Sequence, residues 1–167
     1  METHEARKLS FPEENVGKEF EKVAMKSDDA ALFREIQKNA EMGIKAIETL
    51  LPKVGDDPFS LYLNQKELQY SQIRDRAKRE MLREKEEYAR IGAVSELALK
   101  GSIHAGTIFN TSISHIADLM IRGNSRGISG IWKALNHHEN AGEESRELAE
   151  ELLNLEQKNI TELKKYL

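Results

Sequence analysis

Hydrophobic residues recur at steps of three and four along most of this chain, with polar and charged residues between them. The clearest stripe predicts an amphipathic helix over residues 29–51, and it consists of Leu32, Phe33, Ile36, Ala40, Ile44, Ile47 and Leu51. Pro52 predicts the end of that helix, because the residue before a proline avoids the helical region. A second helix is expected to begin at Asp57 and to run to about residue 99, with Gly92 as a candidate break.

The second half of the chain repeats this pattern. A stop at residues 100–102 (KGS) predicts that a third helix runs over about 102–136. Asn140 with Glu143 predicts a capping box for a fourth helix over 143–166. These spacings predict four long helices in two similar pairs.

A short helix is expected before the first long one. Ser10 with Glu13 forms a capping-box pattern, and Ser27 or Asp28 is expected to cap the helix that follows. We therefore divide the chain into residues 1–28, a tail with a short helix, and residues 29–167, a single domain.

An internal repeat supports the pairing of the helices. Residues 36–51 (IQKNAEMGIKAIETLL) align with residues 120–135 (MIRGNSRGISGIWKAL), which places Gly43 opposite Gly127 at an offset of 84. In the second helix of each pair, after the loop that follows the repeat, the apolar faces align best at an offset of 90. The repeat spans 29–77 and 113–167, and it predicts an all-α, antiparallel four-helix bundle with long second and third helices.

Composition narrows the possible functions. The formal net charge of −4 gives no reason to expect nucleic-acid binding, and the absence of cysteine excludes disulfides and thiolate chemistry. The first ten residues (METHEARKLS) lack the apolar segment of a signal peptide, and no apolar run is long enough for a transmembrane segment. We expect a cytoplasmic protein.

The doubled hairpin resembles the ferritin-like superfamily over residues 29–166. The resemblance is carried by the repeat and by residues 41–44 (EMGI), which are echoed at 126–128 (RGI). It implies a dimetal site built from a glutamate on each of two helices and an E-x-x-H motif on each of the others. Neither motif is present, because residues 156–159 read EQKN and the matching residues 66–69 read KELQ. A register one residue later gives ELQY, again without histidine.

The residues that remain favour a polar core layer over a metal site. The residual carboxylate candidates are Glu41, Glu67 and Glu156, too few to hold two cations, and we expect no cofactor. Our hypothesis is that Lys66 pairs with Glu156 in a buried layer that replaces the metals, with Gln69, Asn124 and Asn159 as neutral partners. The alternative is that Lys66 and Glu156 reach the surface of an all-apolar bundle.

Histidines offer two further metal candidates. His104, His115 and Asp118 fall on one side of the predicted third helix, and residues 137–139 (HHE) lie at its end. We favour packing or interface roles for the first group and a helix-end role for the second.

These observations favour a non-catalytic interaction or structural protein. We expect a homodimer or larger oligomer, with the charged extension of the second and third helices as the contact surface. One alternative is a metal-dependent oxidase or metal-storage protein with a di-iron or di-manganese site at Glu41, Glu67 and Glu156 and a histidine from elsewhere. Another is a protein that binds a membrane surface or a small ligand.

Overall fold

The computed structural model describes residues 13–83, 93–107 and 110–167, and these residues are helical apart from short turns and loops. The described residues form five α-helices: α1 (Glu13–Leu50), α2 (Asp57–Arg83), α3 (Ala93–Thr107), α4 (Ile113–His137) and α5 (Glu143–Leu163). Two short 3-10 helices follow α1 and α5, at Leu51–Lys53 and Lys164–Tyr166. The predicted all-α class is confirmed. None of the described helices is long and apolar enough to cross a membrane.

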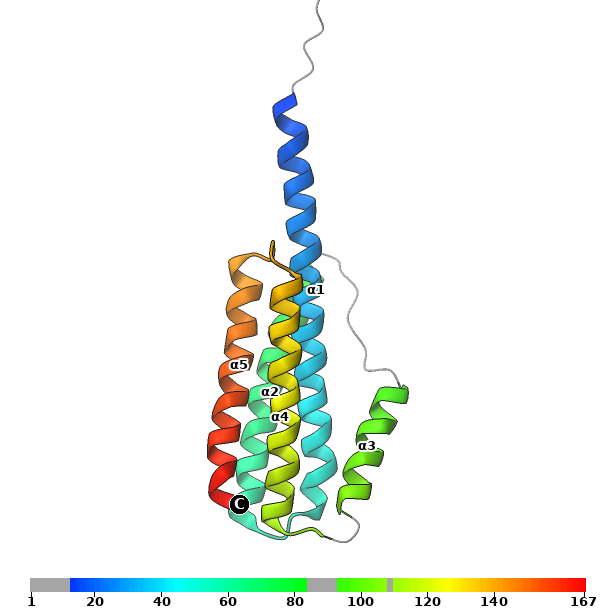
Figure 1. The fold of residues 1–167 in the computed structure, drawn as a ribbon, viewed down its shortest axis with the longest axis vertical. Helices are drawn as coiled ribbons and strands as arrows, with labels where there is room; N and C mark the ends of the chain where they lie inside the picture. Colours follow the sequence, from blue (N-terminus) through cyan, green and yellow to red (C-terminus); the bar gives the residue numbers. More distant parts are fainter. Residues whose placement is uncertain (1–12, 84–92, 108–109) are drawn as a thin grey trace, which may run out of the picture.

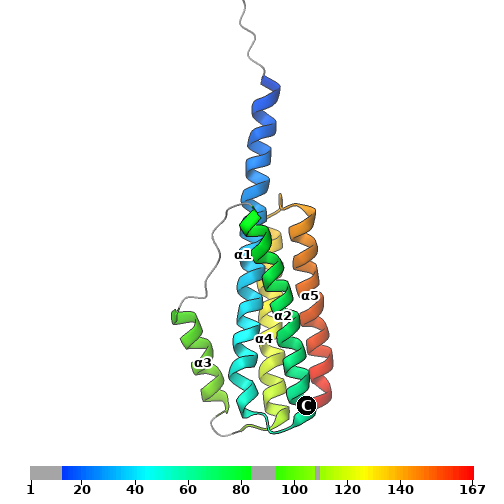
Figure 2. The ribbon, with the colours of Figure 1, turned by 180° about the vertical axis from the view of Figure 1, so that it is seen from behind.

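Four of these helices, α1, α2, α4 and α5, lie side by side, and α3 lies outside them along α1 (Figure 1). The view from behind shows the same order (Figure 2). Helices α1 and α5 run in one direction, and α2 and α4 run in the other. The chain therefore forms two antiparallel hairpins, α1 with α2 and α4 with α5.

The core lies between the four long helices and is built from the predicted apolar stripes. Each helix turns one face inward because its apolar residues recur every three or four positions. The fully buried side chains include Ile36 and Ile47 from α1, Phe59 and Leu63 from α2, Ile116 and Ile131 from α4, and Leu148, Leu152 and Leu163 from α5.

The first helix differs from the prediction. A break near Asp28 was expected, with a separate short helix before it, but α1 is continuous from Glu13 to Leu50, and its N-terminal part extends beyond the other helices (Figure 1). Asp28 lies within α1 rather than at the start of a helix. Its carboxylate instead accepts a hydrogen bond from the backbone N–H of Asn140, at 3.1 Å.

The start of α5 also differs. Gly142, rather than Asn140, is the N-cap residue, and it makes no side-chain capping bond. The missing acceptor comes from α1: Asp29 Oδ1 accepts from the backbone N–H of Gly142, at 2.7 Å, and from the Ser145 hydroxyl. A tertiary contact thus satisfies one of the free N–H groups that open this helix, that of Gly142.

The predicted third helix is divided in two. Residues 100–102, expected to separate helices, lie within α3, and the break comes later, where Ser112 caps α4 by accepting from the backbone N–H of His115. The Asn110 side chain accepts from the backbone N–H of Ser112, at 2.9 Å. Local bonds of this kind compete with helical ones, which explains the break. The proposed break at Gly92 lies outside the described residues.

Candidate functional site

A cluster of polar side chains lies at the middle of the bundle. It consists of Tyr70 on α2, Asn124 on α4, and Glu156 and Asn159 on α5, and each is at most 6% exposed. We refer to these four residues as the buried polar cluster. Buried polar groups are costly unless they find hydrogen-bond partners, so the contacts among them decide the chemistry of the core.

Hydrogen bonds join three helices through the cluster. The Tyr70 hydroxyl donates to Asn124 Oδ1 at 2.9 Å. Asn159 Nδ2 lies 3.3 Å from both the Tyr70 hydroxyl oxygen and Asn124 Oδ1. Asn124 Nδ2 donates to the backbone oxygen of Met120 at 2.7 Å. The cluster therefore fixes α2, α4 and α5 relative to one another.

The two repeated glycines make room for two cluster members. A Cβ atom at Gly43 would lie 2.9 Å from Tyr70 Cζ, and one at Gly127 would lie 2.7 Å from Glu156 Cδ. Real Cβ atoms essentially never come so close to another atom. Each hairpin thus packs one large side chain directly on the glycine of its partner helix.

These contacts give a different register from the one the sequence comparison preferred. Tyr70 and Glu156 occupy equivalent places in their hairpins, at an offset of 86 (156 minus 70), whereas sequence comparison paired Lys66 with Glu156 at 90. The two offsets differ by four residues, about one helical turn.

Glu156 has an unusual environment for a carboxyl group. It is 2% exposed, and among the described residues no cation lies within ion-pairing distance and Oε2 has no hydrogen-bond partner. Burial raises the pKa of Glu156 to about 8, although the nearby Tyr70 hydroxyl opposes part of that rise. The pKa of Tyr70 is also raised, by burial and then by Glu156. Both groups are therefore mainly protonated at neutral pH.

The predicted polar layer is brought together only in part. Asn124 and Asn159 lie within hydrogen-bonding distance of each other and Glu156 is buried one turn before Asn159 on α5, but Lys66 Nζ lies 2.6 Å from Glu162 and pairs with it instead of with Glu156. Gln69 is half-buried. Its Oε1 atom is buried and has no hydrogen-bond partner among the residues that the structure describes. Sequence reasoning did not assign a role to Tyr70. The alternative register with the segment ELQY would align Tyr70 with Asn159, at an offset of 89 (159 minus 70), and so does not indicate the observed position either.

The residual carboxylate candidates do not converge. Glu41 Oε2 lies 3.7 Å from Arg74 Nη1, Glu67 is half-buried on α2, and Glu156 lies against Gly127. Among the residues the structure describes, no three histidine, aspartate or glutamate side chains are grouped to hold a metal ion. A dimetal centre needs several anionic or imidazole ligands, so this donor set does not fit one.

The histidine candidates are also separated. His104 is exposed on α3, whereas His115 lies on α4 with its Nε2 atom 2.6 Å from the backbone oxygen of Gly106. Asp118 forms an ion pair with Arg122. His137 lies exposed in the last turn of α4, which agrees with a helix-end position.

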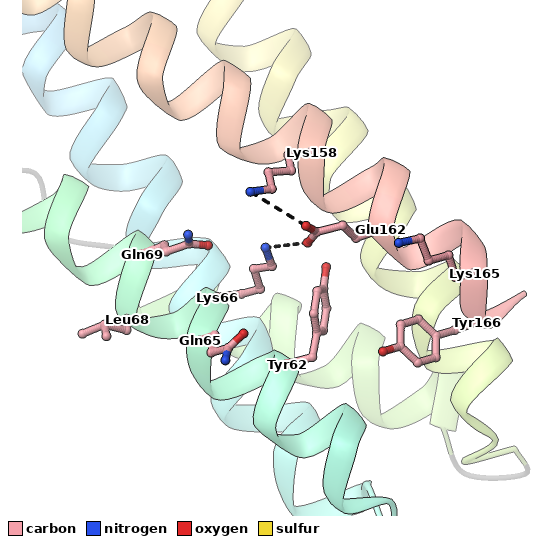
Figure 3. Close-up of a pocket in the computed structure, with 9 residues that line it drawn as sticks. All are labelled: Tyr62, Gln65, Lys66, Leu68, Gln69, Lys158, Glu162, Lys165 and Tyr166. Carbon is pink, nitrogen blue, oxygen red and sulfur yellow. Dashed lines mark ion pairs between the residues drawn. The ribbon is translucent and has the colours of Figure 1, made fainter.

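A cavity of about 440 Å³ opens between α2 and the end of α5, beside the cluster (Figure 3). We call it the α2–α5 cavity, and it is lined by Tyr62, Gln65, Lys66, Leu68, Gln69, Lys158, Glu162, Lys165 and Tyr166. Lys66 Nζ lies 5.0 Å from the centre of the Tyr62 ring. The Tyr62 hydroxyl also donates to the backbone oxygen of Asn159, at 3.5 Å, which connects the cavity wall to the cluster.

Comparison of the chain with protein-family models, with curated proteins and with solved structures gives no match.

Proposed function

We propose that the chain is a non-catalytic helical bundle that acts as an interaction or structural protein. In this proposal the four long helices are arranged as in the ferritin-like superfamily. The buried polar cluster occupies the position that a dimetal site takes in that superfamily. The order and direction of the two hairpins support this arrangement (Figure 1). The position of the cluster at mid-bundle, on α2, α4 and α5, supports the replacement of metal by hydrogen bonds.

The contact between Glu156 and Gly127 is the observation that carries the proposal. Metal ligation requires a charged carboxylate with open space on its far side. Glu156 instead lies against the backbone of α4, where a Cβ atom at Gly127 would be 2.7 Å from Glu156 Cδ. Asn159, at the position of the expected histidine, is engaged with Tyr70 and Asn124.

Metal analysis tests the proposal. The purified protein is expected to contain far less than one equivalent of iron or manganese, to melt at the same temperature with and without a chelator, and to show no oxygen-dependent absorbance change with ferrous iron. Stoichiometric metal whose removal lowers the melting temperature would refute the proposal.

The outer face of α2 supports the expected self-association. Leu61, Leu68 and Leu82 are 56–61% exposed and are separated by seven and fourteen residues. A seven-residue spacing places side chains along a narrow stripe, the pattern of a seam between two helices. We propose that a second copy of this chain packs on this stripe. The charged extension expected as the contact surface includes residues 84–92, which lie outside the described residues.

A further inference from the structure

Lys66 lies at the inner wall of the α2–α5 cavity, and its surroundings are unusual for a lysine. Its side chain is only 6% exposed, and one Glu162 oxygen lies 2.6 Å from Nζ. The Tyr62 ring, 5.0 Å away, adds a cation–π contact. An ammonium group carries three N–H donors, and Glu162 is the one acceptor found for Lys66 in the described part of the chain. The group therefore retains donors for a ligand in the cavity.

The charges around the cavity do not balance. Lys66, Lys158 and Lys165 line it together with a single carboxylate, Glu162 (Figure 3). Lys158 Nζ lies 3.9 Å from the second Glu162 oxygen. The lining residues thus carry two more positive than negative charges, which matches the charge of about −1.5 to −2 on a phosphate monoester at neutral pH.

The remaining lining residues favour an organic ligand over a bare anion. The half-buried Gln69 side chain lines the cavity, and its Oε1 atom has no hydrogen-bond partner among the described residues, so rotation of this amide toward the cavity would let it accept from a ligand hydroxyl. The Tyr62 and Tyr166 rings, with centres 6.0 Å apart, form one wall. A volume of about 440 Å³ is adequate for a small molecule.

We propose that the α2–α5 cavity binds a small phosphate monoester. Lys66, Lys158 and Lys165 hold the phosphate group, and a hydroxyl of the organic part donates to Gln69 Oε1. This binding site goes beyond the proposed function, because it requires no particular occupant of the core, and it shares one residue, Leu68, with the outer stripe of α2.

Amide NMR titrations with glycerol phosphate test the site, with glycerol and inorganic phosphate as comparison ligands, at an ionic strength of about 0.15 M. Glycerol phosphate is expected to shift the amide signals of residues 62–69 and 158–166. Inorganic phosphate is expected to shift the same signals more weakly, and glycerol to leave them unchanged. The substitution Lys165→Ala is expected to weaken the binding of glycerol phosphate about threefold or more.

Lys164→Ala is the matched control, because Lys164 is exposed next to Lys165 but does not line the cavity. It is expected to leave the affinity for glycerol phosphate unchanged. Equal losses in the two variants would mean diffuse attraction between charges and would overturn the proposal. Absence of shifts up to about 10 mM ligand, or shifts confined to other helices, would overturn it as well.

Discussion

The Glu156 carboxyl group on α5 lies directly against the backbone of Gly127 on α4, where a Cβ atom would be 2.7 Å from Glu156 Cδ. The Tyr70 ring lies on Gly43 in the same way in the other hairpin. The glycine is therefore the common part of the two hairpins, and the side chain packed on it differs. This explains why the repeat retains its glycine while its polar residues diverge.

Replacing Gly127 by alanine is expected to destabilise the protein by about 1–3 kcal/mol, because Glu156 must move out of a closely packed position. Gly123→Ala is the control on the same helix, since nothing lies within 4 Å of the added Cβ atom. That variant is expected to gain up to about 1 kcal/mol from helix propensity. Urea denaturation measures both, and equal stability of the two variants would contradict the packing account.

Removing the Tyr70 hydroxyl is expected to cost about 1–3 kcal/mol in the variant Tyr70→Phe, because buried partners on Asn124 and Asn159 lose a hydrogen bond. Tyr62→Phe removes a longer bond, 3.5 Å, from a half-buried residue and is expected to cost about 0.5 kcal/mol or less. Thermal and urea denaturation distinguish the two. A Tyr70→Phe variant as stable as wild type would show that the cluster does not stabilise the fold.

The free energy of unfolding is expected to depend on pH through the ionisation of the Glu156 carboxyl group. Its pKa rises from 4.5 to about 8 on folding, so the folded state binds the proton more tightly than the unfolded state. This contribution to stability is complete below pH 4.5 and is lost as the pH rises to about 8, with a slope of up to about 1.4 kcal/mol per pH unit.

The variant Glu156→Gln lacks this titration and isolates the effect from that of other groups. The wild type is expected to lose stability relative to Glu156→Gln between pH 5 and 8, as followed by urea denaturation at each pH. Parallel stability curves for the two proteins would rule out a buried protonated carboxyl group.

The outer stripe of α2 is expected to mediate self-association. Light scattering after gel filtration should give the mass of a dimer or larger oligomer for the wild type, and a lower mass for the double variant Leu61→Gln, Leu82→Gln. Leu97→Gln is the control, because Leu97 is 73% exposed but lies on α3. A wild-type monomer, or dissociation by the control substitution, would contradict this assignment.

Local sequence patterns predicted the helices well where the apolar period is strong. The stripe from Leu32 to Ile47 is buried in α1, but Leu50 is buried at its end in place of the predicted Leu51, which is half-buried in the 3-10 helix that follows. Asn124, Glu156 and Asn159 face inward because they lie at helical spacing from inner apolar residues. The break before Ser112 was missed, because it depends on short bonds from polar side chains rather than on periodicity.

The partners of individual polar residues could not be predicted in the same way. Lys66 can face either Glu156 or Glu162, depending on how far α2 is displaced along α5, and the apolar pattern does not fix that displacement. A shift by one helical turn keeps every inner face inward, which is why offsets of 86 and 90 both align apolar residues. The cap of α5 by Asp29 was likewise missed, since it joins residues 113 positions apart.

Direct titration of the Glu156 carboxyl carbon by NMR, with Glu156→Gln used to assign its signal, tests the central claim most directly. If the buried polar cluster replaces a metal site, this carboxyl group stays protonated at neutral pH and titrates with a pKa of about 8. A pKa near 4.5 in the folded protein would mean that Glu156 is charged in the core, and it would contradict this account.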